Sequence, residues 1–365
     1  MKIVSRGTKY TIYDESIQTY DALPIGTYVI GYNQNEGCYL VRRADICVTE
    51  KTYGVHDAKV KKVMESFVGF DRNLGVILSG DKGIGKSMFA KLLCVESVLR
   101  GIPVLIVDAA YPGIARFIET IEQECLILFD EFDKTFTSTR DNDAQAGLLS
   151  LFDGTAGGKK LFVVTCNELY GLNDYIVNRP GRFHYHFRFD YPGSVEISDY
   201  LYDKLLPEYY SQIPSVVAFA HKISLNYDCL RAIAFELNLG VDFKEAVSDL
   251  NILNVNREEY NIILHFENGA TLHQWRYRTN LFGSDGTYQW ATMYNDAGVD
   301  VADLRFDPNK VVYDIRHNTT IIPAEGLYLS FDDYEDCKES EAYKSLAMTY
   351  LSFQKCATKN LHYVI

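Results

Sequence analysis

The sequence predicts an α/β protein in which helices cover both faces of a parallel sheet, with β-rich segments before and after it. Continuous apolar runs of strand length, such as LGVILSG (74–80) and CLILFDE (125–131), alternate with amphipathic stretches of helical spacing. Strands that are apolar at every position are typical of a sheet buried on both faces. From residue 195 the pattern becomes helical only, and β-branched and aromatic runs occupy both ends of the chain.

Residues 1–51 are predicted to form a β-rich N-terminal domain. The apolar residues of this region fall into short runs with turn residues between them, as strands and turns do. The runs are YTIYDESIQTY (10–20), GTYVIGYN (26–33) and CYLVRRADICV (38–48). At residues 55–67 the apolar residues change to helical spacing, which marks the next domain.

Residues 52–192 are predicted to be the α/β core, and residues 193–248 a small helical subdomain. In the core, expected strands alternate with expected helices. The strands are expected at 74–80, 103–109, 125–131 and 160–167, and the helices at 87–100, 113–123 and 142–152. The subdomain is expected to be helical because amphipathic segments recur at 195–206, 215–224 and 227–238.

Residues 249–365 are predicted to form a β-rich C-terminal domain that ends in a helix. The segment YNIILHFENGATLHQWRYR (260–278) has the pattern of a hairpin that turns at Asn268-Gly269. Further strands are expected at 287–294, 302–306, 311–317 and 326–331, and the final helix at about 340–355.

Composition limits the classes of function. The formal charge of -13 argues against a surface that coats nucleic acid, although it allows a small basic patch or pore. The eight cysteines are scattered without a C-x-x-C pair, so we expect reduced thiols rather than a zinc site. No apolar run is long enough to span a bilayer, and the polar N-terminus does not resemble a secretory signal. We therefore expect a cytoplasmic protein without a membrane partner.

A phosphate-binding motif, G-x-x-x-x-G-K-S, occupies residues 80–87 between an expected strand and an expected helix, which is the context it requires. Glycines let backbone amides turn inward around phosphate oxygens, and the helix N-terminus adds a favourable dipole. We expect Lys86 to reach the β- and γ-phosphates and Ser87 to ligate Mg²⁺. A glycine-rich turn without a ligand is the alternative. The expected nucleotide-binding residues are Gly80, Asp81, Lys82, Gly83, Ile84, Gly85, Lys86, Ser87 and Met88.

Polar residues follow two of the later buried strands. Asp130 and Glu131 end CLILFDE, at the strand edge where open α/β sheets bind ligands. We expect Asp130 to hold Mg²⁺ and Glu131 to polarise the attacking water, the alternative being solvated acids at a strand end. Asp133 is expected to be a surface charge. Asn167, at the tip of LFVVTCNE, is expected to bond the γ-phosphate or the attacking water.

This order of motifs resembles that of the AAA+ ATPases, and the details resemble the narrower AAA clade. LLSLFDGTAGGKKLFVVTCNE (148–168) is similar to its stretch with L-L, D-G and a strand ending in T-N, and NRPGRF (178–183) resembles its R-P-G-R-F. The resemblance covers about residues 53–240. It implies a P-loop NTPase fold with a helical lid, ATP and Mg²⁺ as ligands, and a homo-oligomeric ring, most often a hexamer. It also makes Arg179 the leading arginine finger toward the neighbouring subunit's ATP, with Arg182 as its partner.

Further residues match the family by position. Tyr111 in Y-P-G (111–113) falls where the family has a pore loop that grips substrate, although a plain strand-to-helix turn is an equal alternative. Arg231 falls where many AAA+ lids carry a nucleotide-sensing arginine, which the narrower clade often lacks. Tyr53 and Gly54 are expected near adenine by analogy. The β-rich segment before a single AAA module is also similar to the Bcs-type AAA proteins, whose membrane-spanning helix is missing here.

The segment HQWRYRTNLF (273–282) interleaves arginines with aromatic residues, a composition that can bind single-stranded nucleic acid. In a regular strand, however, Trp275 and Tyr277 share one face, and Arg276 and Arg278 the other. The simpler interpretation is a core face and a solvated face.

Three functions are compatible with these features. The first is a ring-forming ATPase that remodels or threads a macromolecule, with a protein favoured by the acidic charge and by Tyr111. The second is an ATP-dependent nucleic-acid transaction factor, such as a loader, favoured by Arg231 and the aromatic-basic strand. The third is a slow, ATP-gated assembly scaffold in which the β-rich regions bind partners.

Overall fold

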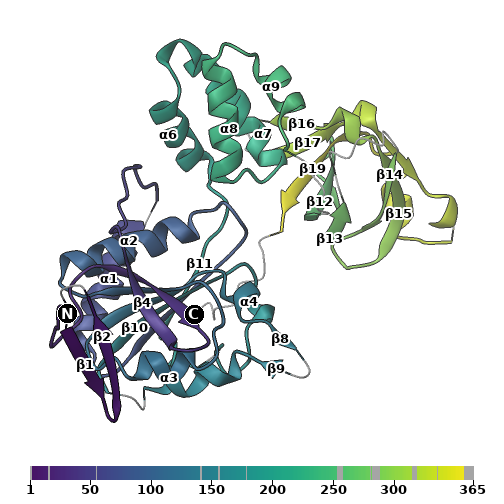
Figure 1. Cartoon of the computed structure of the whole chain (residues 1–365). Helices are drawn as coiled ribbons and strands as arrows, with labels where there is room; N and C mark the ends of the chain where they lie inside the picture. Colours follow the sequence, from purple (N-terminus) through teal and green to yellow (C-terminus); the bar gives the residue numbers. More distant parts are fainter. Residues whose placement is uncertain are drawn as a thin grey trace. The chain divides into compact units, whose positions relative to one another are not determined.

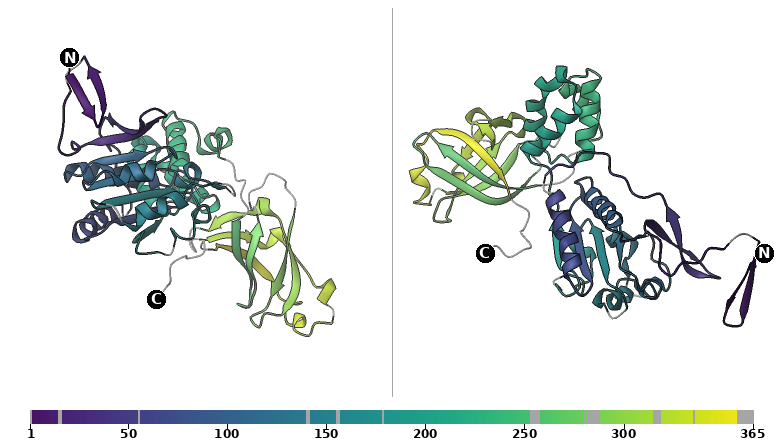
Figure 2. Two further views of the ribbon diagram at one scale, coloured as in Figure 1. Left: turned by 60° about the horizontal axis from the view of Figure 1, so that its bottom comes forward. Right: turned by 90° about the vertical axis from the view of Figure 1, so that its left-hand side faces the viewer.

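The computed structural model describes residues 2–14, 17–54, 56–139, 142–154, 157–177, 179–252, 258–279, 281, 288–314, 319–334 and 336–356. The chain divides into two compact units, Met1–Tyr191 and Pro192–Ile365. The first unit contains a sheet with helices on both faces, and the second contains a helical part and an antiparallel sheet (Figures 1 and 2).

The first unit is built on a seven-stranded sheet with strand order β11-β5-β10-β7-β6-β3-β4. All neighbours run parallel except the edge pair β3 and β4. The strands are β3 (Thr27–Asn33), β4 (Gly37–Arg43), β5 (Leu74–Ser79), β6 (Val104–Val107), β7 (Cys125–Phe129), β10 (Lys160–Cys166) and β11 (Tyr185–Arg188). Every residue of β5, β7 and β10 is buried, as their continuous apolar sequences predict.

Helices cover both faces of this sheet, which confirms the predicted α/β class. The helices α1 (His56–Gly69) and α2 (Lys86–Leu99) pack on one face. The other face is covered by α3 (Ile114–Glu119), α4 (Phe132–Thr135), η1 (Ala146–Leu148) and α5 (Leu149–Asp153).

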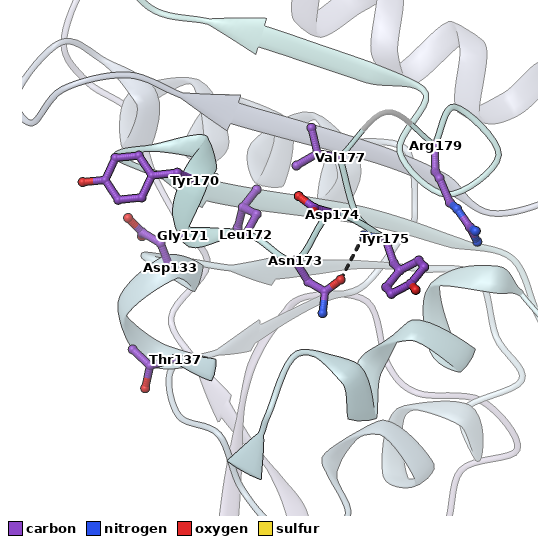
Figure 3. Close-up of a pocket in the computed structure, with 10 residues that line it drawn as sticks. All are labelled: Asp133, Thr137, Tyr170, Gly171, Leu172, Asn173, Asp174, Tyr175, Val177 and Arg179. Atoms are coloured by element: carbon purple, nitrogen blue, oxygen red, sulfur yellow. Dashed lines mark hydrogen bonds between the residues drawn. The ribbon is translucent and has the colours of Figure 1, made fainter. Parts of the chain in front are cut away.

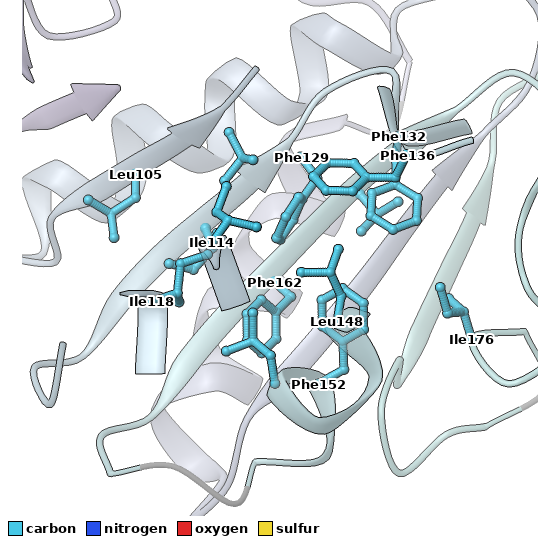
Figure 4. Packing of buried hydrophobic residues seen from close by; sticks show 14 of the residues in the cluster. Leu105, Ile114, Ile118, Phe129, Phe132, Phe136, Leu148, Phe152, Phe162 and Ile176 are labelled. Carbon is cyan, nitrogen blue, oxygen red and sulfur yellow. The ribbon is translucent and has the colours of Figure 1, made fainter. Parts of the chain in front are cut away.

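A cluster of phenylalanines fixes the end of β7 against the helices beside it (Figure 4). Phe129 contacts Phe132, Phe136 and Phe152 edge to face, with ring centroids 5.6 to 5.8 Å apart. Each buried phenylalanine contributes roughly 1.5–3 kcal/mol of transfer free energy. The two residues that follow Phe129, Asp130 and Glu131, are therefore attached to a closely packed part of the unit.

Two segments of the first unit differ from expectation. β3 and β4 are outer strands of the core sheet, because β3 pairs with β6, whereas the predicted boundary at residue 51 puts them in a separate domain. Only β1 (Lys2–Arg6) and β2 (Lys9–Tyr13) form a hairpin of their own. The helix expected at 142–152 begins at Ala146, since Asn142 and Asp143 form β9, paired with β8 (Ser138–Thr139).

The helical part of the second unit matches the predicted segments. It contains α6 (Ser194–Lys204), η3 (Pro207–Gln212), α7 (Ile213–Lys222), α8 (Tyr227–Asn238) and α9 (Phe243–Asp249). Side chains that cap helix starts explain two boundaries: Asn226 accepts a hydrogen bond from the Cys229 amide, and Asp242 from the Lys244 amide.

The β-rich part of the second unit is an eight-stranded antiparallel sheet with strand order β16-β17-β19-β12-β13-β14-β15-β18. Its strands are β12 (Glu258–Phe266), β13 (Thr271–Thr279), β14 (Gln289–Tyr294), β15 (Asp300–Phe306), β16 (Val312–Asp314), β17 (Thr319–Pro323), β18 (Leu327–Ser330) and β19 (Met348–Lys355). Short 3-10 turns connect them: η4 (Pro308–Lys310), η5 (Ala324–Gly326), η6 (Asp332–Tyr334) and η7 (Ser340–Ala342). The hairpin predicted at Asn268-Gly269 is confirmed, with Gly269 at a φ of 84°.

The final helix predicted at about 340–355 is wrong. Residues 340–342 form η7, and Met348–Lys355 form β19, which lies between β12 and β17. Leu351 and Phe353 point into the core of the sheet. The two-residue spacing of these side chains fits a strand, and pairing on both sides outweighs the helical spacing of the surrounding apolar residues.

Among the helices of the described segments, none is long and apolar enough to cross a membrane.

Candidate nucleotide site

The loop between β5 and α2 has the backbone conformation of a phosphate cradle. Gly80, Gly83 and Gly85 have φ values of 138°, 74° and 102°, a region that favours glycine. A Cβ atom on Gly80 would lie 2.4 Å from the carbonyl oxygen of Phe189. The glycine spacing of the motif therefore meets two needs, a left-handed backbone and close packing against the chain beside it.

The N-terminus of α2 opens into this loop. Its N-cap residue, Gly85, provides no side-chain hydrogen bond, and first-turn amides have no partner within a helix. Ser87, in that first turn, is exposed. Free amides and a helix dipole at one place suit a phosphate group. The residues present thus fit a nucleotide phosphate chain.

Lys86 is buried in the loop with a relative exposure of 8%. Its Nζ donates to the carbonyl oxygens of Gly80 and Asp81, each at 2.5 Å, and to Asn167 Oδ1 at 3.3 Å. Burial lowers the pKa of Lys86, and the carboxylates of Asp81 and Asp130 act in the opposite direction. A phosphate anion would stabilise the ammonium group further.

Asp130 is held at the end of β7 by a residue that the sequence analysis did not single out. Thr165, buried on β10, donates from Oγ1 to Asp130 Oδ1 at 2.7 Å. The same Oγ1 accepts from the Glu131 amide at 2.8 Å. One threonine therefore positions both members of the acidic pair.

Glu131 has a left-handed backbone with φ 48° and is the N-cap residue of α4. This conformation is uncommon outside glycine and turns the side chain away from the core. The carboxylate is exposed and forms an ion pair with Lys134. The hydrogen bond from Lys134 holds the pKa of Glu131 below its usual range, so the group is a carboxylate at neutral pH.

Asn167 links the loop lysine to Asp133. The side-chain Oδ1 of Asn167 accepts from Lys86, and the backbone amide of Asn167 donates to Asp133 Oδ2 at 3.0 Å. The expectation that Asp133 is a surface charge is wrong: Oδ1 of this residue is buried and has no hydrogen-bond partner within the described segments. An acid in this position anchors the tip of β10 beside the acidic pair.

Arg182 does not face outward as expected. It is buried at 8% exposure and donates from Nε and Nη2 to the two carboxylate oxygens of Asp153, and from Nη1 to the Tyr175 carbonyl at 2.6 Å. Because its guanidinium nitrogens bond to Asp153 and to the Tyr175 carbonyl, Arg182 stabilises the turn at residues 179–182. Arg179 is exposed, and its guanidinium lies over the Tyr175 ring at 5.3 Å.

A surface hollow of about 890 Å³ separates α4 from the segment that leads to Arg179 (Figure 3). Its lining includes Asp133 of α4, Thr137, and Tyr170, Tyr175 and Arg179 from the later segment. Asp133 therefore belongs both to the hollow and to the contact chain that ends at Lys86.

The structure does not test the roles predicted for the remaining residues. Tyr111 is half-buried and stacks on Tyr32 of β3, with ring centroids 5.7 Å apart, which favours the plain-turn interpretation. The carbonyl of Tyr53 is bonded by His56, and Gly54 has a φ of 77°. Arg231 is exposed on α8, in the second unit. The roles of these four residues stay predictions.

The fold and the loop define a P-loop nucleotide-binding domain: a parallel sheet delivers a glycine-rich loop, an acidic pair and a polar strand tip to one edge. Residues 76–191 match the family of ATPases associated with various cellular activities, AAA. This part of the chain is an AAA domain of the AAA+ superfamily. The chain is also 27% identical over 150 residues to Protein mac-1 of Caenorhabditis elegans; the match covers 37% of this chain and 18% of that relative.

Proposed function

We propose that this chain is a ring-forming ATPase that couples ATP hydrolysis to the remodelling or threading of a macromolecule. The observation that carries the proposal is that two sets of contacts meet at the end of β10. Lys86 contacts Asn167, and Thr165 holds both Asp130 and Glu131. These are the groups that an ATPase needs for phosphate binding, metal binding and water activation.

In this proposal, residues 80–88 hold the phosphate chain. Lys86 exchanges its contacts with the loop carbonyls for β- and γ-phosphate oxygens. Ser87 and Asp130 would hold Mg²⁺, which would neutralise charge on the phosphates. Thr165 already occupies Oδ1 of Asp130, so we assign Oδ2 to the metal.

Glu131 then acts as the general base. It takes a proton from water as the water oxygen bonds to the γ-phosphorus, and the bridging oxygen leaves with ADP. Lys134 keeps the carboxylate ionised. Asn167, which is fixed by Asp133, orients the water or the γ-phosphate.

Arg179 acts in trans, on the ATP of a neighbouring subunit in a homo-oligomeric ring, for which we propose a hexamer. Its exposure supports this role, because a finger must leave its own chain to reach a neighbour. The buried Arg182 supports the turn that presents Arg179.

A protein is the macromolecule favoured by the net charge of -13. A second candidate, a nucleic-acid transaction factor, is favoured by exposed aromatic and arginine side chains on β13 to β15. The packing of Tyr111 on Tyr32 weakens the case for threading by that loop.

Glu131→Gln tests the proposal. The variant should bind ATP with Mg²⁺ as the wild type does, because the amide keeps the shape of the side chain. Its turnover should fall by roughly 10²–10⁴-fold, the usual contribution of general-base catalysis. ATP binding by equilibrium dialysis and phosphate release measure the two quantities, and light scattering shows whether ATP-bound oligomers accumulate.

Lys86→Ala is the matched control, since it should lose nucleotide binding and hydrolysis together. Wild-type turnover in Glu131→Gln would remove Glu131 from the mechanism. Absence of ATP binding by the wild type would remove the proposed function itself.

A further inference from the structure

The outward face of β14, β15 and β18 carries a row of exposed aromatic side chains around one arginine. Strand register places Trp290 opposite Arg305, and Arg305 opposite Tyr328. Tyr288 precedes Trp290 by two positions. The three aromatic residues are 53% to 56% exposed, although aromatic side chains of this size usually bury most of their surface. The row therefore leaves several ring faces open to solvent.

Arg305 lies among these rings and forms no ion pair within the described residues. Its Cζ is 4.5 Å from the Tyr288 centroid, 5.2 Å from Tyr328 and 5.7 Å from Trp290. Its Nε is buried and has no hydrogen-bond partner within the described residues. By contrast, Arg278 on β13 is paired with Glu259. A guanidinium whose contacts in the described residues are with rings can still pair with an external anion.

A β-bulge extends this face onto β13 and overturns the expected alternation. Arg276 has a φ of 54°, its amide donates to Asn261 Oδ1, and the register with β12 shifts between Tyr260 and Ile262. The extra residue separates the faces on which Trp275 and Tyr277 lie.

Tyr277 packs against Phe306 in the core. Trp275 is 58% exposed and stacks flat on His273, with an interplanar angle of 6°. His273 and Trp275 line a hollow of about 530 Å³, together with Tyr294 and Asp296. The predicted core face of β13 is thus partly a solvent face with aromatic side chains.

We propose that this face of β13, β14, β15 and β18 binds single-stranded nucleic acid. Bases can stack on the open rings of Trp275, Trp290 and Tyr328, while Arg305 pairs with a phosphate. The carboxylates of an acidic peptide could pair with Arg305, but they would not stack on the exposed rings of β13, β14 and β18. The acidic net charge of the whole chain does not decide the matter, because the local charge at Arg305 is uncompensated within the described residues.

Both tryptophans of the chain, Trp275 and Trp290, lie on this face. Base stacking should therefore quench the entire tryptophan emission. Titration of the nucleotide-free Lys86→Ala protein with oligothymidylate at low salt should give saturable quenching that weakens as salt rises. The use of Lys86→Ala separates this surface from ATP binding, so failure here leaves the ATPase proposal intact.

Arg305→Gln, combined with Lys86→Ala, keeps both reporters and should weaken binding roughly tenfold or more, as should Trp290→Ala by loss of a stacking platform. Tyr202→Ala on α6 removes an aromatic of similar exposure, 53%, and should bind as the parent protein does. Circular dichroism checks the fold of each variant, and Arg305→Gln decides the matter if Trp290→Ala fails to fold.

No quenching at low salt would overturn the proposal. Unchanged affinity in Arg305→Gln would also overturn it. Polyglutamate that displaces the oligonucleotide at equal charge concentration would show that the face takes acidic peptides instead.

Discussion

Arg179 and Arg182 are three positions apart and have different chemical surroundings. Each nitrogen of the Arg182 guanidinium donates within the chain, to Asp153 or to Tyr175. A group bound in this way reaches a second molecule only by breaking those bonds, which leaves a buried guanidinium without its partners. The guanidinium of Arg179 lies over the Tyr175 ring, and its side chain is exposed. Arg182 therefore supports the turn, whereas Arg179 is available to contact another molecule.

Asp153→Asn tests the supporting contact through its dependence on pH. Arg182 lowers the pKa of Asp153 in the folded protein. The stabilisation is thus fully present above the ordinary carboxyl pKa of about 4, and it is lost as pH falls through the lower folded pKa. Because the Asp153 side chain is 43% exposed, solvent screens the pair, and at neutral pH the substitution should cost about 1 kcal/mol. Urea unfolding at a series of pH values measures the difference.

Arg179→Ala is the control for this contact and should change stability by less than about 0.5 kcal/mol, as exposed substitutions usually do. A wild-type advantage over Asp153→Asn that grew on acidification would contradict the assignment.

At the scale of elements, the register of parallel strands assembles the site. β10 pairs with β7 so that Val164 is opposite Phe129, which puts Thr165 beside Asp130. The sequence did contain a signal for Thr165, since it is a polar residue in an otherwise apolar strand. The register itself was not available, because it depends on how two distant segments pack.

Leu351→Ala tests the strand β19 that replaces the expected helix. Leu351 is fully buried and lies opposite Leu264 on one side and Ile322 on the other. Its truncation should cost about 2–5 kcal/mol, since both the transfer free energy and a cavity contribute. Tryptophan emission during urea unfolding reports this sheet selectively, because both tryptophans of the chain are in it.

Gln354→Ala, on the exposed side of the same strand, should change the midpoint little. Equal effects of the two substitutions would show that β19 does not pack as described.

The sequence predicted elements whose signal is local. Buried strands such as β5 and β10 are apolar throughout, and the glycines of residues 80–85 fit the left-handed conformations of the loop. Features that depend on contacts between residues far apart in the sequence were not predicted. At the bulge the Arg276 amide bonds to Asn261, fifteen positions away, and Asp133 accepts from the backbone amide of Asn167. Tertiary pairing overrides local pattern at such positions.

At the scale of the whole molecule, the proposed ring requires residues of two chains to meet. In that proposed ring, Glu131 is assigned to the ATP bound by its own chain and Arg179 to the ATP bound by a neighbour. Loss of an arginine finger reduces turnover by roughly 10³–10⁵-fold, so Arg179→Ala and Glu131→Gln should each be nearly inactive. At any one boundary, Glu131 and Arg179 belong to different chains. Loss of one residue can therefore be made good by a subunit that lacks only the other.

Mixing the two inactive variants should restore hydrolysis. A boundary is active when an Arg179→Ala subunit, with Glu131 intact, faces a Glu131→Gln subunit that supplies Arg179. Random exchange at equal amounts gives this arrangement at roughly a quarter of boundaries, so about that share of wild-type phosphate release is expected for independent, symmetric sites. Mixing Arg179→Ala with the double variant Glu131→Gln, Arg179→Ala should restore nothing, because neither chain then offers a finger. If both mixtures stayed inactive after subunit exchange had been verified, Arg179 would not act between subunits; if Arg179→Ala alone were active, it would not act in hydrolysis at all.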